Sequence, residues 1–387
     1  MRFEFSTASR ILFGPGTIGE VAPNAAAWGK RALLAVDDSL EFVSRLEESL
    51  RKQGISVTRF SVSGEPTTET VRLGMQAARE SDCDLVIGIG GGSVLDSGKA
   101  IAALLPQEGE IMDFLEVIGQ GRALTQPSIP SIAIPTTAGT GAEVTRNAVL
   151  TSTEHRVKVS LRSHFMLPRL AVVDPELTYT LSPALTAATG MDALTQLIEA
   201  YVCNSPNPAT DALCWEGIRR ASGALRRAYR NGRDVEAREE MSLASLFGGM
   251  VLANAKLGAV HGLAGPLGGR LGAPHGAVCA CLLPIVFETN WQALQKRSPA
   301  SPVLLRFKSI AQILIGKPTA EIPEAVKWLY ALRADLSIPS LSHFGLNESM
   351  ISDIAAQAQK AGSMTGNPIR LADTELSSIL RQSLYCS

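Results

Sequence analysis

The chain has 387 residues, of which 45% are hydrophobic and 19% are charged, so it is long enough for two domains with their own cores. Its 36 Lys and Arg residues nearly balance 37 Asp and Glu residues, which gives a formal net charge of -1. No basic run is present, and this excludes the usual electrostatic signature of a nucleic-acid or membrane-surface binder. We therefore expect a small-molecule partner, no nucleic acid and no membrane.

The cysteine and hydropathy patterns suggest a cytoplasmic protein. The first residues contain no apolar secretion signal, and the densest apolar stretch, residues 277–287, is short for a bilayer span and contains a proline. None of the six cysteines forms a C-x-x-C pair. Cys279 and Cys281 lie within the apolar stretch, and we interpret them as core residues because free cysteine is commonly buried.

The first half of the chain alternates short aliphatic runs with segments of helical length. The predicted strands are residues 31–38, 55–62, 84–90 and 131–137. Strands that alternate with helices in this way are typical of βαβ units and of a parallel sheet covered on both faces. This half is therefore predicted to be a doubly wound α/β domain.

The second half has helical periodicity almost throughout. Its start is indicated by Ser182 and Pro183, because serine is a common helix N-cap and proline is favoured at the first helical position. The segment 170–183 is taken as the junction between the two halves. We predict an α/β N-terminal dinucleotide-binding domain over residues 1–180, followed by an all-α C-terminal domain over residues 181–387.

A glycine-rich segment, residues 88–93, directly follows the third predicted strand and opens a helix. Gly91 and Gly92 would let the backbone approach a pyrophosphate, and Ser93 lies at a helix N-terminus, where anions are stabilised. The alternative is a plain tight turn in which Ser93 caps the helix, with Asp96 at capping-box spacing.

A second polar turn, residues 135–147, follows the next predicted strand. Such turns gather at the carboxyl edge of a parallel sheet, so Thr136, Thr137 and Thr140 are predicted phosphate or ribose donors. Asp37 ends the first predicted strand, where a carboxylate accepts hydrogen bonds from an adenosine ribose and repels a 2′-phosphate. This favours NAD over NADP, although Asp37 equally fits a helix cap.

Four polar residues of the second half suggest a metal site. Asp192 and Gln196 are four residues apart on a predicted helix, so both side chains project from one face, roughly 6 Å apart along the axis. His261 and His275 lie among small apolar residues. Taken singly, the Asp–Gln pair fits a helix-stabilising contact and each histidine fits a core position; together they suggest a site for a divalent metal.

The chain resembles the iron-containing (group III) alcohol dehydrogenases of the dehydroquinate-synthase-like fold nearly end to end. The resemblance is carried by FGPGTIGEV (13–21), GIGGGSVLDSGKA (88–100), PTTAGTGAEVT (135–145), TGMDALTQLIEAYV (189–202), LGAVHGLAGPLGG (257–269) and APHGAVCACLLP (273–284). It implies an N-terminal dinucleotide-binding domain, a helical C-terminal domain, a cleft between them, and homodimers joined partly through the N-terminal strand.

The resemblance also implies a set of site residues. The family binds Fe²⁺ or Zn²⁺ through an aspartate and three histidines. Asp192, His261 and His275 match three of these, which makes them the expected catalytic metal ligands, and Gln196 stands where a histidine belongs and is expected to be a weak fourth ligand. A further histidine common in the family is Gly265 here, which removes a candidate proton relay.

On the cofactor side, Asp96 resembles a residue near the nicotinamide, and Lys158 is expected along the route to it. The pocket for the substrate is expected to be lined near Phe247, Val251 and Leu252.

The resulting hypothesis is an oxidoreductase that transfers hydride between NAD(H) and a small alcohol, aldehyde or ketone, with a divalent metal in the interdomain cleft. One alternative is a metal-independent reductase of the maleylacetate-reductase type, which Gln196 keeps open. Two others are a lyase like dehydroquinate synthase and a nucleotide-binding scaffold without activity.

Overall fold

In the computed structural model, which describes residues 2–155 and 157–385, the chain divides into two compact units. The α/β unit is Ser6–Tyr179, and the helical unit is Thr180–Ser387 together with Met1–Phe5. The predicted fold class, an α/β domain followed by a helical one, is confirmed.

The α/β unit is built on a six-stranded sheet with the order β1-β8-β5-β4-β2-β3, in which all the pairs are parallel. Its strands are β1 (Ile11–Phe13), β2 (Arg31–Val36), β3 (Ser56–Ser61), β4 (Leu85–Gly90), β5 (Ser131–Pro135) and β8 (Leu170–Val173). Every residue of β4, β5 and β8 is buried. Strands covered on both faces read as continuous aliphatic runs, which is why the sequence indicated β4 and β5 clearly.

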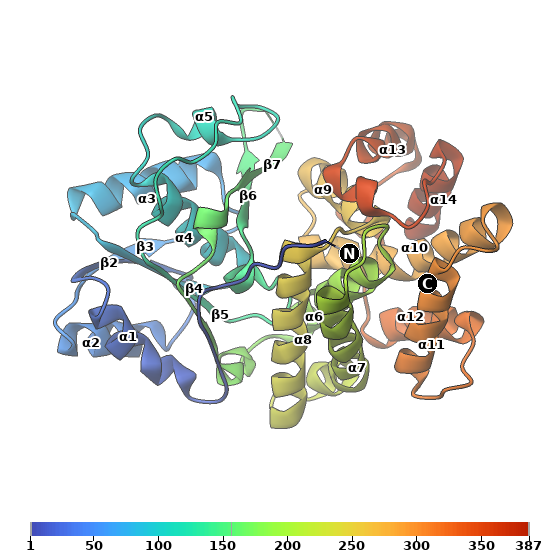
Figure 1. The fold of residues 1–387 in the computed structure, drawn as a ribbon, viewed down its shortest axis with the longest axis horizontal. Coiled ribbons are helices and arrows are strands. Elements are labelled where there is room, and N and C mark those ends of the chain that lie inside the picture. Colours follow the sequence, from blue (N-terminus) through green and yellow to red (C-terminus); the bar gives the residue numbers. More distant parts are fainter. Residues whose placement is uncertain (1, 156, 386–387) are drawn as a thin grey trace. The chain divides into compact units, whose positions relative to one another are not determined.

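Helices cover both faces of this sheet (Figure 1). Apolar residues of α1 (Val21–Ala26) and α2 (Val43–Lys52) pack on one face, and those of α3 (Thr68–Glu80) and α4 (Gly92–Leu104) pack on the other. A short helix, α5 (Ile111–Phe114), and an antiparallel hairpin of β6 (Asn147–Ser152) and β7 (Val157–Arg162) complete the unit.

Four strands of this unit were not predicted. β1 and β8 have three and four residues, and each strand of the hairpin has six. Residues 170–173 were read as part of a junction, whereas β8 lies between β1 and β5. Runs as short as β1 and β8 carry too little periodicity to be distinguished from a loop, and these two strands pair with each other across more than 150 residues of sequence. The hairpin strands β6 and β7 pair with each other and are as long as β2, so neither reason applies to them.

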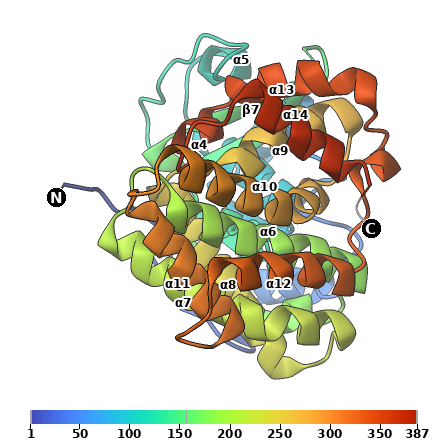
Figure 2. The same ribbon diagram turned by 90° about the vertical axis from the view of Figure 1, so that its right-hand side faces the viewer.

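The helical unit contains no strand within its described residues. Its helices are α6 (Pro183–Val202), α7 (Pro208–Arg230), α8 (Val235–Asn254), α9 (Ala259–Leu271), α10 (His275–Arg297), α11 (Val303–Ile315), α12 (Ile322–Asp335), α13 (Ile351–Gln359) and α14 (Asp373–Ser383). As predicted, Ser182 caps α6, since its hydroxyl accepts the Leu185 amide at 3.2 Å and Pro183 follows. Figure 2 shows α6 and α10 running side by side through this unit.

By length and composition α10 could cross a membrane, yet 78% of its apolar window is buried inside the protein. The apolar stretch 277–287 is therefore part of a longer helix than the sequence suggested. Core helices of large proteins commonly have this composition.

Candidate functional site

Helix α6 presents a buried polar stripe. Asp192, Gln196 and Glu199 occupy positions i, i+4 and i+7, which one helical face brings into line. Their exposed fractions are 2%, 2% and 5%. Buried charged and amide groups need polar partners or an ion, so this stripe marks a site.

The start of α9 is held by side chains from elsewhere in the helical unit. Gly258 occupies the N-cap position and offers no side chain. Glu199 accepts the Val260 amide at 2.7 Å, and Asn367 accepts the Ala259 amide at 3.0 Å. A carboxylate at a helix N-terminus satisfies open N–H groups and complements the helix dipole. These two hydrogen bonds fix the first turn of α9 and with it the position of the His261 side chain.

Helix α10 begins at His275 because the chain turns sharply after α9. Gly272 ends α9 with a φ of 63°, the left-handed conformation that glycine adopts freely, and Pro274 precedes the first helical residue. Cys279 follows His275 by one helical turn, and its Sγ lies 3.6 Å from His275 Nε2.

These three helices bring four potential ligands together. His261 Nε2 and His275 Nε2 lie 3.6 and 3.7 Å from Asp192 Oδ1. The ligand atoms of Asp192, His261, His275 and Cys279 all lie within 4.8 Å of one another. Donors that share an ion at 2.0–2.3 Å lie roughly 3.3–3.7 Å apart, whereas a direct charged hydrogen bond is ~2.8 Å long.

Two atoms in this cluster support a cation directly. Asp192 Oδ1 and His261 Nε2 are buried and have no hydrogen-bond partner within the described residues. A buried polar atom without a partner is costly, and a divalent ion would satisfy both at once. The donor set of a carboxylate, imidazoles and a thiol suits first-row divalent metals.

Charge around His261 also favours a cation. His261 Nδ1 donates to Glu199 Oε2 at 2.6 Å, which leaves Nε2 to face Asp192. Burial alone lowers the pKa of His261, but the nearby carboxylates of Asp192 and Glu199 outweigh it and raise the pKa to about 10. Burial likewise raises the pKa of Asp192, and His275 and His261 more than offset this, so the net shift is downward. The carboxylates of Asp192 and Glu199 therefore stabilise positive charge at this buried site.

The site is more open at His275. Its side chain is 38% exposed, against 7% for His261 and 2% for Asp192. The cluster is therefore most accessible to solvent at His275.

The two departures from the family pattern have different surroundings. Gln196 Nε2 donates to Asp192 Oδ2 at 3.3 Å, and a Cβ placed on Gly248 of α8 would lie 2.9 Å from Gln196 Oε1. Gln196 therefore contacts both the aspartate and α8. A Cβ placed on Gly265 would have no atom within 4 Å, so the position of the missing histidine is open space.

Sequence reasoning missed one site residue and misread another. Glu199 was not singled out, although its i+7 spacing from Asp192 was a usable signal. Cys279 was interpreted as a core residue; it is fully buried, as expected, but it also belongs to the ligand cluster. Four further cysteines, Cys83, Cys203, Cys214 and Cys281, are buried, and Cys386 lies outside the described residues.

In the α/β unit, three strand ends form a row. Val36 pairs with Ile89, and Gly90 pairs with Pro135. The residues that follow β2, β4 and β5 therefore lie at one edge of the sheet. The chain runs outward from β2 to β3 and in the opposite direction from β4 to β5 and β8, so this edge is a topological switch point, where nucleotides bind in open α/β sheets.

The two polar turns adjoin at this edge. A Cβ on Gly92 would lie 2.8 Å from Thr140 Cγ2, and one on Gly91 would lie 3.5 Å from Thr137 Cγ2. The Thr136 amide donates to the Gly90 carbonyl at 3.0 Å. The threonines and glycines that were predicted to act together are thus brought together.

The start of α4 differs from the capping-box alternative. Gly91 is the N-cap and Ser93 lies inside the helix, with no side-chain cap. Asp96 instead accepts the Val149 amide at 2.9 Å and pairs with buried Lys99 at 2.9 Å. Because no side chain occupies the first amides of α4, they remain suited to an anion.

Asp37 and Lys158 already have protein partners. Asp37 Oδ1 accepts the Ser39 amide at 3.0 Å and its hydroxyl at 2.8 Å. This is a turn contact and not the helix cap that the sequence left open, because α2 has Phe42 at its N-cap and no side-chain cap. It holds the carboxylate at the strand end. Lys158 Nζ lies 3.2 Å from Glu65 Oε2.

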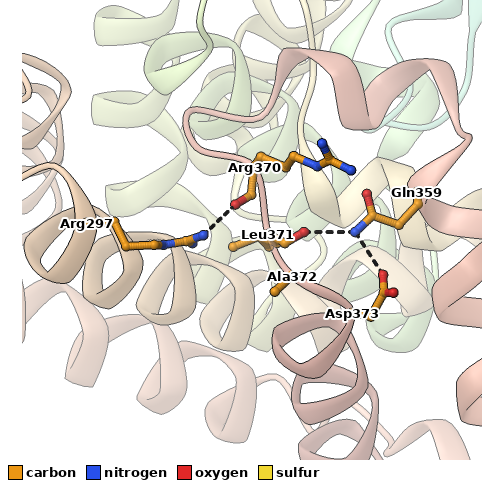
Figure 3. A pocket seen from close by; sticks show the side chains of 6 residues that line it. All are labelled: Arg297, Gln359, Arg370, Leu371, Ala372 and Asp373. Atoms are coloured by element: carbon orange, nitrogen blue, oxygen red, sulfur yellow. Dashed lines mark hydrogen bonds between the residues drawn. The ribbon is translucent and has the colours of Figure 1, made fainter.

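A separate hollow in the helical unit is unrelated to this chemistry. It is lined by Arg297, Gln359, Arg370, Leu371, Ala372 and Asp373 (Figure 3). Arg297 ends α10, so the hollow lies ~33 Å along the helix axis from His275. The Arg297 guanidinium already donates hydrogen bonds to the Arg370 carbonyl at 2.9 Å and to the Glu375 carboxylate at 3.0 Å.

Comparisons with known proteins agree with this geometry. Residues 8–175 match the family described as "Iron-containing alcohol dehydrogenase", and residues 186–384 match "Fe-containing alcohol dehydrogenase family, C-terminal". The chain is 36% identical to 1,3-propanediol dehydrogenase of Klebsiella pneumoniae, with 98% of each chain covered.

Solved structures are similar over the whole chain. A crystal structure of 1,3-propanediol oxidoreductase has a TM-score of 0.91 and 36% identity, and the match covers 99% of this chain and 100% of that one. Sulfoacetaldehyde reductase from Bifidobacterium kashiwanohense, solved in complex with NAD+, has a TM-score of 0.87 and 28% identity, with 99% of each chain covered.

Proposed function

The chain belongs to the iron-containing alcohol dehydrogenase family, and from this we propose that it transfers hydride between NAD(H) and a small aliphatic alcohol or aldehyde at the Asp192–His261–His275 site. The observation that carries the proposal is the convergence of these ligand atoms from three helices, with Asp192 Oδ1 and His261 Nε2 buried and lacking hydrogen-bond partners.

The residues of this site divide the work. Asp192, His261 and His275 would hold a divalent metal, Fe²⁺ or Zn²⁺, which when bound supplies Lewis-acid polarisation of the substrate oxygen. Glu199 fixes the His261 ring and keeps its proton on Nδ1. His275, the most exposed of the three, borders the side from which the substrate oxygen arrives. The alcohol loses a hydride to NAD⁺ and a proton to solvent, since Gly265 offers no imidazole to relay it.

The cofactor would bind at the sheet edge formed by the residues that follow β2, β4 and β5. Gly91, Gly92 and Ser93 would receive the pyrophosphate at the α4 N-terminus. The neighbouring threonines of the second turn, Thr136, Thr137 and Thr140, would supply further donors. The NAD⁺ complex of the related sulfoacetaldehyde reductase supports this choice of cofactor.

Three acidic and basic residues complete the cofactor proposal. Asp37 would accept the adenosine ribose hydroxyls and select NAD over NADP. Asp96 and Lys158 would lie toward the nicotinamide; their present bonds to Val149 and Glu65 hold both side chains in place. A clear preference for NADPH in turnover assays would remove Asp37 from this role.

A small aliphatic substrate is proposed because helix α8 contacts Gln196 through Gly248. On this helix Phe247 and Leu252 are half-buried, while Val251 is fully buried. An apolar wall beside the site favours short carbon chains over charged substrates.

The proposal extends to assembly and compartment. Phe3 and Phe5 are 48% and 37% exposed, as expected for an N-terminal segment that joins two copies in a homodimer. Cys83, Cys203, Cys214 and Cys279 are buried thiols outside any disulfide, which fits a reducing cytoplasm.

The test combines metal removal with a substrate panel. Exhaustive chelation should abolish NADH oxidation by short aldehydes, and added Zn²⁺ or Fe²⁺ should restore it. His275→Ala should lower kcat by orders of magnitude, while NAD binding is retained. Full turnover in the chelated enzyme would instead indicate the metal-independent reductase, and NAD binding without net NADH consumption would point to the lyase or the scaffold.

A further inference from the structure

The ligand cluster contains a thiol where the family pattern has no ligand. Cys279 is fully buried on α10, one turn after His275. Its Sγ lies 3.6 Å from His275 Nε2 and within 4.8 Å of the Asp192 and His261 ligand atoms. The 3.6 Å contact is a hydrogen bond between the thiol and the imidazole in this structure, and the same separation matches a nitrogen and a sulfur bound to one ion, because such bonds are about 2.1 and 2.3 Å long.

Gln196 is poorly placed to act as the fourth metal ligand beside Asp192, His261 and His275. Its Nε2 faces Asp192 Oδ2 at 3.3 Å, and since a carboxylate only accepts hydrogen bonds, this contact favours the observed orientation of the amide. The amide oxygen then points to the other side, toward Gly248 of α8. The contact leaves Asp192 Oδ1 directed at the two imidazoles, so Gln196 orients the aspartate.

We propose that Cys279 is a metal ligand in this chain, completing an Asp192–His261–His275–Cys279 set in which Gln196 positions Asp192 without binding the ion. The inference rests on the proposed metal-dependent function. Asp192 Oδ1 and His261 Nε2, both buried without hydrogen-bond partners, point into the same cluster and supply the second, independent sign of a bound cation.

This ligand set has a chemical consequence. A thiolate is a softer and more basic donor than the carboxamide oxygen of Gln196, so it strengthens binding of Zn²⁺ and Co²⁺. Together with Asp192 it brings two negative charges to a divalent ion and neutralises it. The thiol proton is released to solvent when the ion binds.

The first test uses the unaltered protein. With Zn²⁺ loaded, X-ray absorption at the zinc edge should show one sulfur neighbour at ~2.3 Å beside nitrogen and oxygen neighbours at ~2.0–2.1 Å. With Co²⁺ loaded, the near-ultraviolet sulfur-to-cobalt charge-transfer band should be present. A zinc spectrum with only nitrogen and oxygen neighbours would overturn the role of Cys279 while leaving the proposed function intact.

Matched variants distinguish a cysteine that binds the metal from one that is only buried in the helix. Cys279→Ser should lose the cobalt band and should weaken Zn²⁺ binding by more than the ~10–100-fold typical of losing a residue that only supports a ligand. Cys281→Ser, two residues further along the same buried helix, should keep both the band and the affinity. Gln196→Ala should also keep the band, because the thiolate remains.

The outcomes distinguish the two proposals. If the protein takes up no divalent metal and still reduces aldehydes, both the metal site and this inference fall. If it takes up metal and the cobalt band survives Cys279→Ser, only the inference falls. Should Cys279→Ser fail to fold, the spectra of the unaltered protein still decide the question.

Discussion

Glu199 performs two tasks at once: it accepts the first amides of α9 and the ring proton of His261. Both bonds belong to one buried carboxylate, so the position of His261 depends on its charge. Removing the charge weakens the helix cap and lowers the basicity of the imidazole.

We predict that Glu199→Gln lowers Zn²⁺ affinity by ~10–100-fold and destabilises the helical unit by about 1–2 kcal/mol. Competition with a chelator and denaturant unfolding measure the two effects. Glu143→Gln, which removes a buried carboxylate in the other unit, is the matched control and should leave zinc affinity unchanged. Wild-type affinity in Glu199→Gln would show that the hydrogen bond to His261 is not needed.

Glu143 makes stability dependent on pH. It is 2% exposed, and burial raises the pKa of its carboxyl from 4.5 to about 7, with a backbone hydrogen bond and nearby Lys99 opposing part of the shift. Between these two values the folded protein keeps a proton that the unfolded chain has lost. The contribution is fully present below pH 4.5 and declines as the pH rises toward 7.

We therefore predict that Glu143→Gln removes up to about 3 kcal/mol of the stability difference between pH ~5 and pH ~8. Denaturant unfolding of the two proteins at both pH values is the measurement. A glutamine variant with the same pH dependence as the wild type would mean that other groups control it.

At the scale of the element, α10 depends on close contact with α6. A Cβ on Gly276 would lie 2.6 Å from the Ala188 carbonyl oxygen, and this is backbone that cannot rotate away. Gly276 follows His275 directly, so any shift of this helix end moves a predicted ligand.

Gly276→Ala is expected to cost about 1–3 kcal/mol of stability and to weaken zinc binding, as measured by thermal unfolding and chelator competition. The control is Gly265→Ala on α9, where a Cβ meets open space. Alanine there should be neutral or stabilising by up to ~1 kcal/mol, because it is a better helix former than glycine. Unchanged zinc affinity in Gly276→Ala would mean that α6 and α10 adjust without moving His275.

For the whole molecule, the proposed metal site and the proposed NAD site lie in different compact units, so the two ligands should protect these units separately. A ligand at 1,000 times its Kd stabilises its folded unit by about 4 kcal/mol. We predict that Zn²⁺ slows hydrogen exchange mainly in α6, α9 and α10, and that NAD slows it mainly in β4 and α4. Hydrogen exchange followed by mass spectrometry measures this. If Zn²⁺ protected only the α/β unit, the assignment of the metal to α6, α9 and α10 would be wrong.

Local patterns in the sequence determined the alternating strands and helices, the glycine turn after β4 and the N-cap of α6, because each depends on residues adjacent in the chain. They also pointed to Asp192, His261 and His275, whose residue types and motif contexts are distinctive. β1 and β8 escaped prediction, since strands of three and four residues are stabilised by partners distant in sequence. The β6–β7 hairpin, whose strands are neighbours in sequence, was also missed.

Only the tertiary structure decided which side chains meet. The bond between Glu199 and His261 spans 62 residues, and Cys279 reaches Asp192 only because α10 packs along α6. A cysteine in an apolar run looks the same in sequence whether it faces the core or an ion. Helix packing, which depends on the shapes of entire buried faces, makes that distinction.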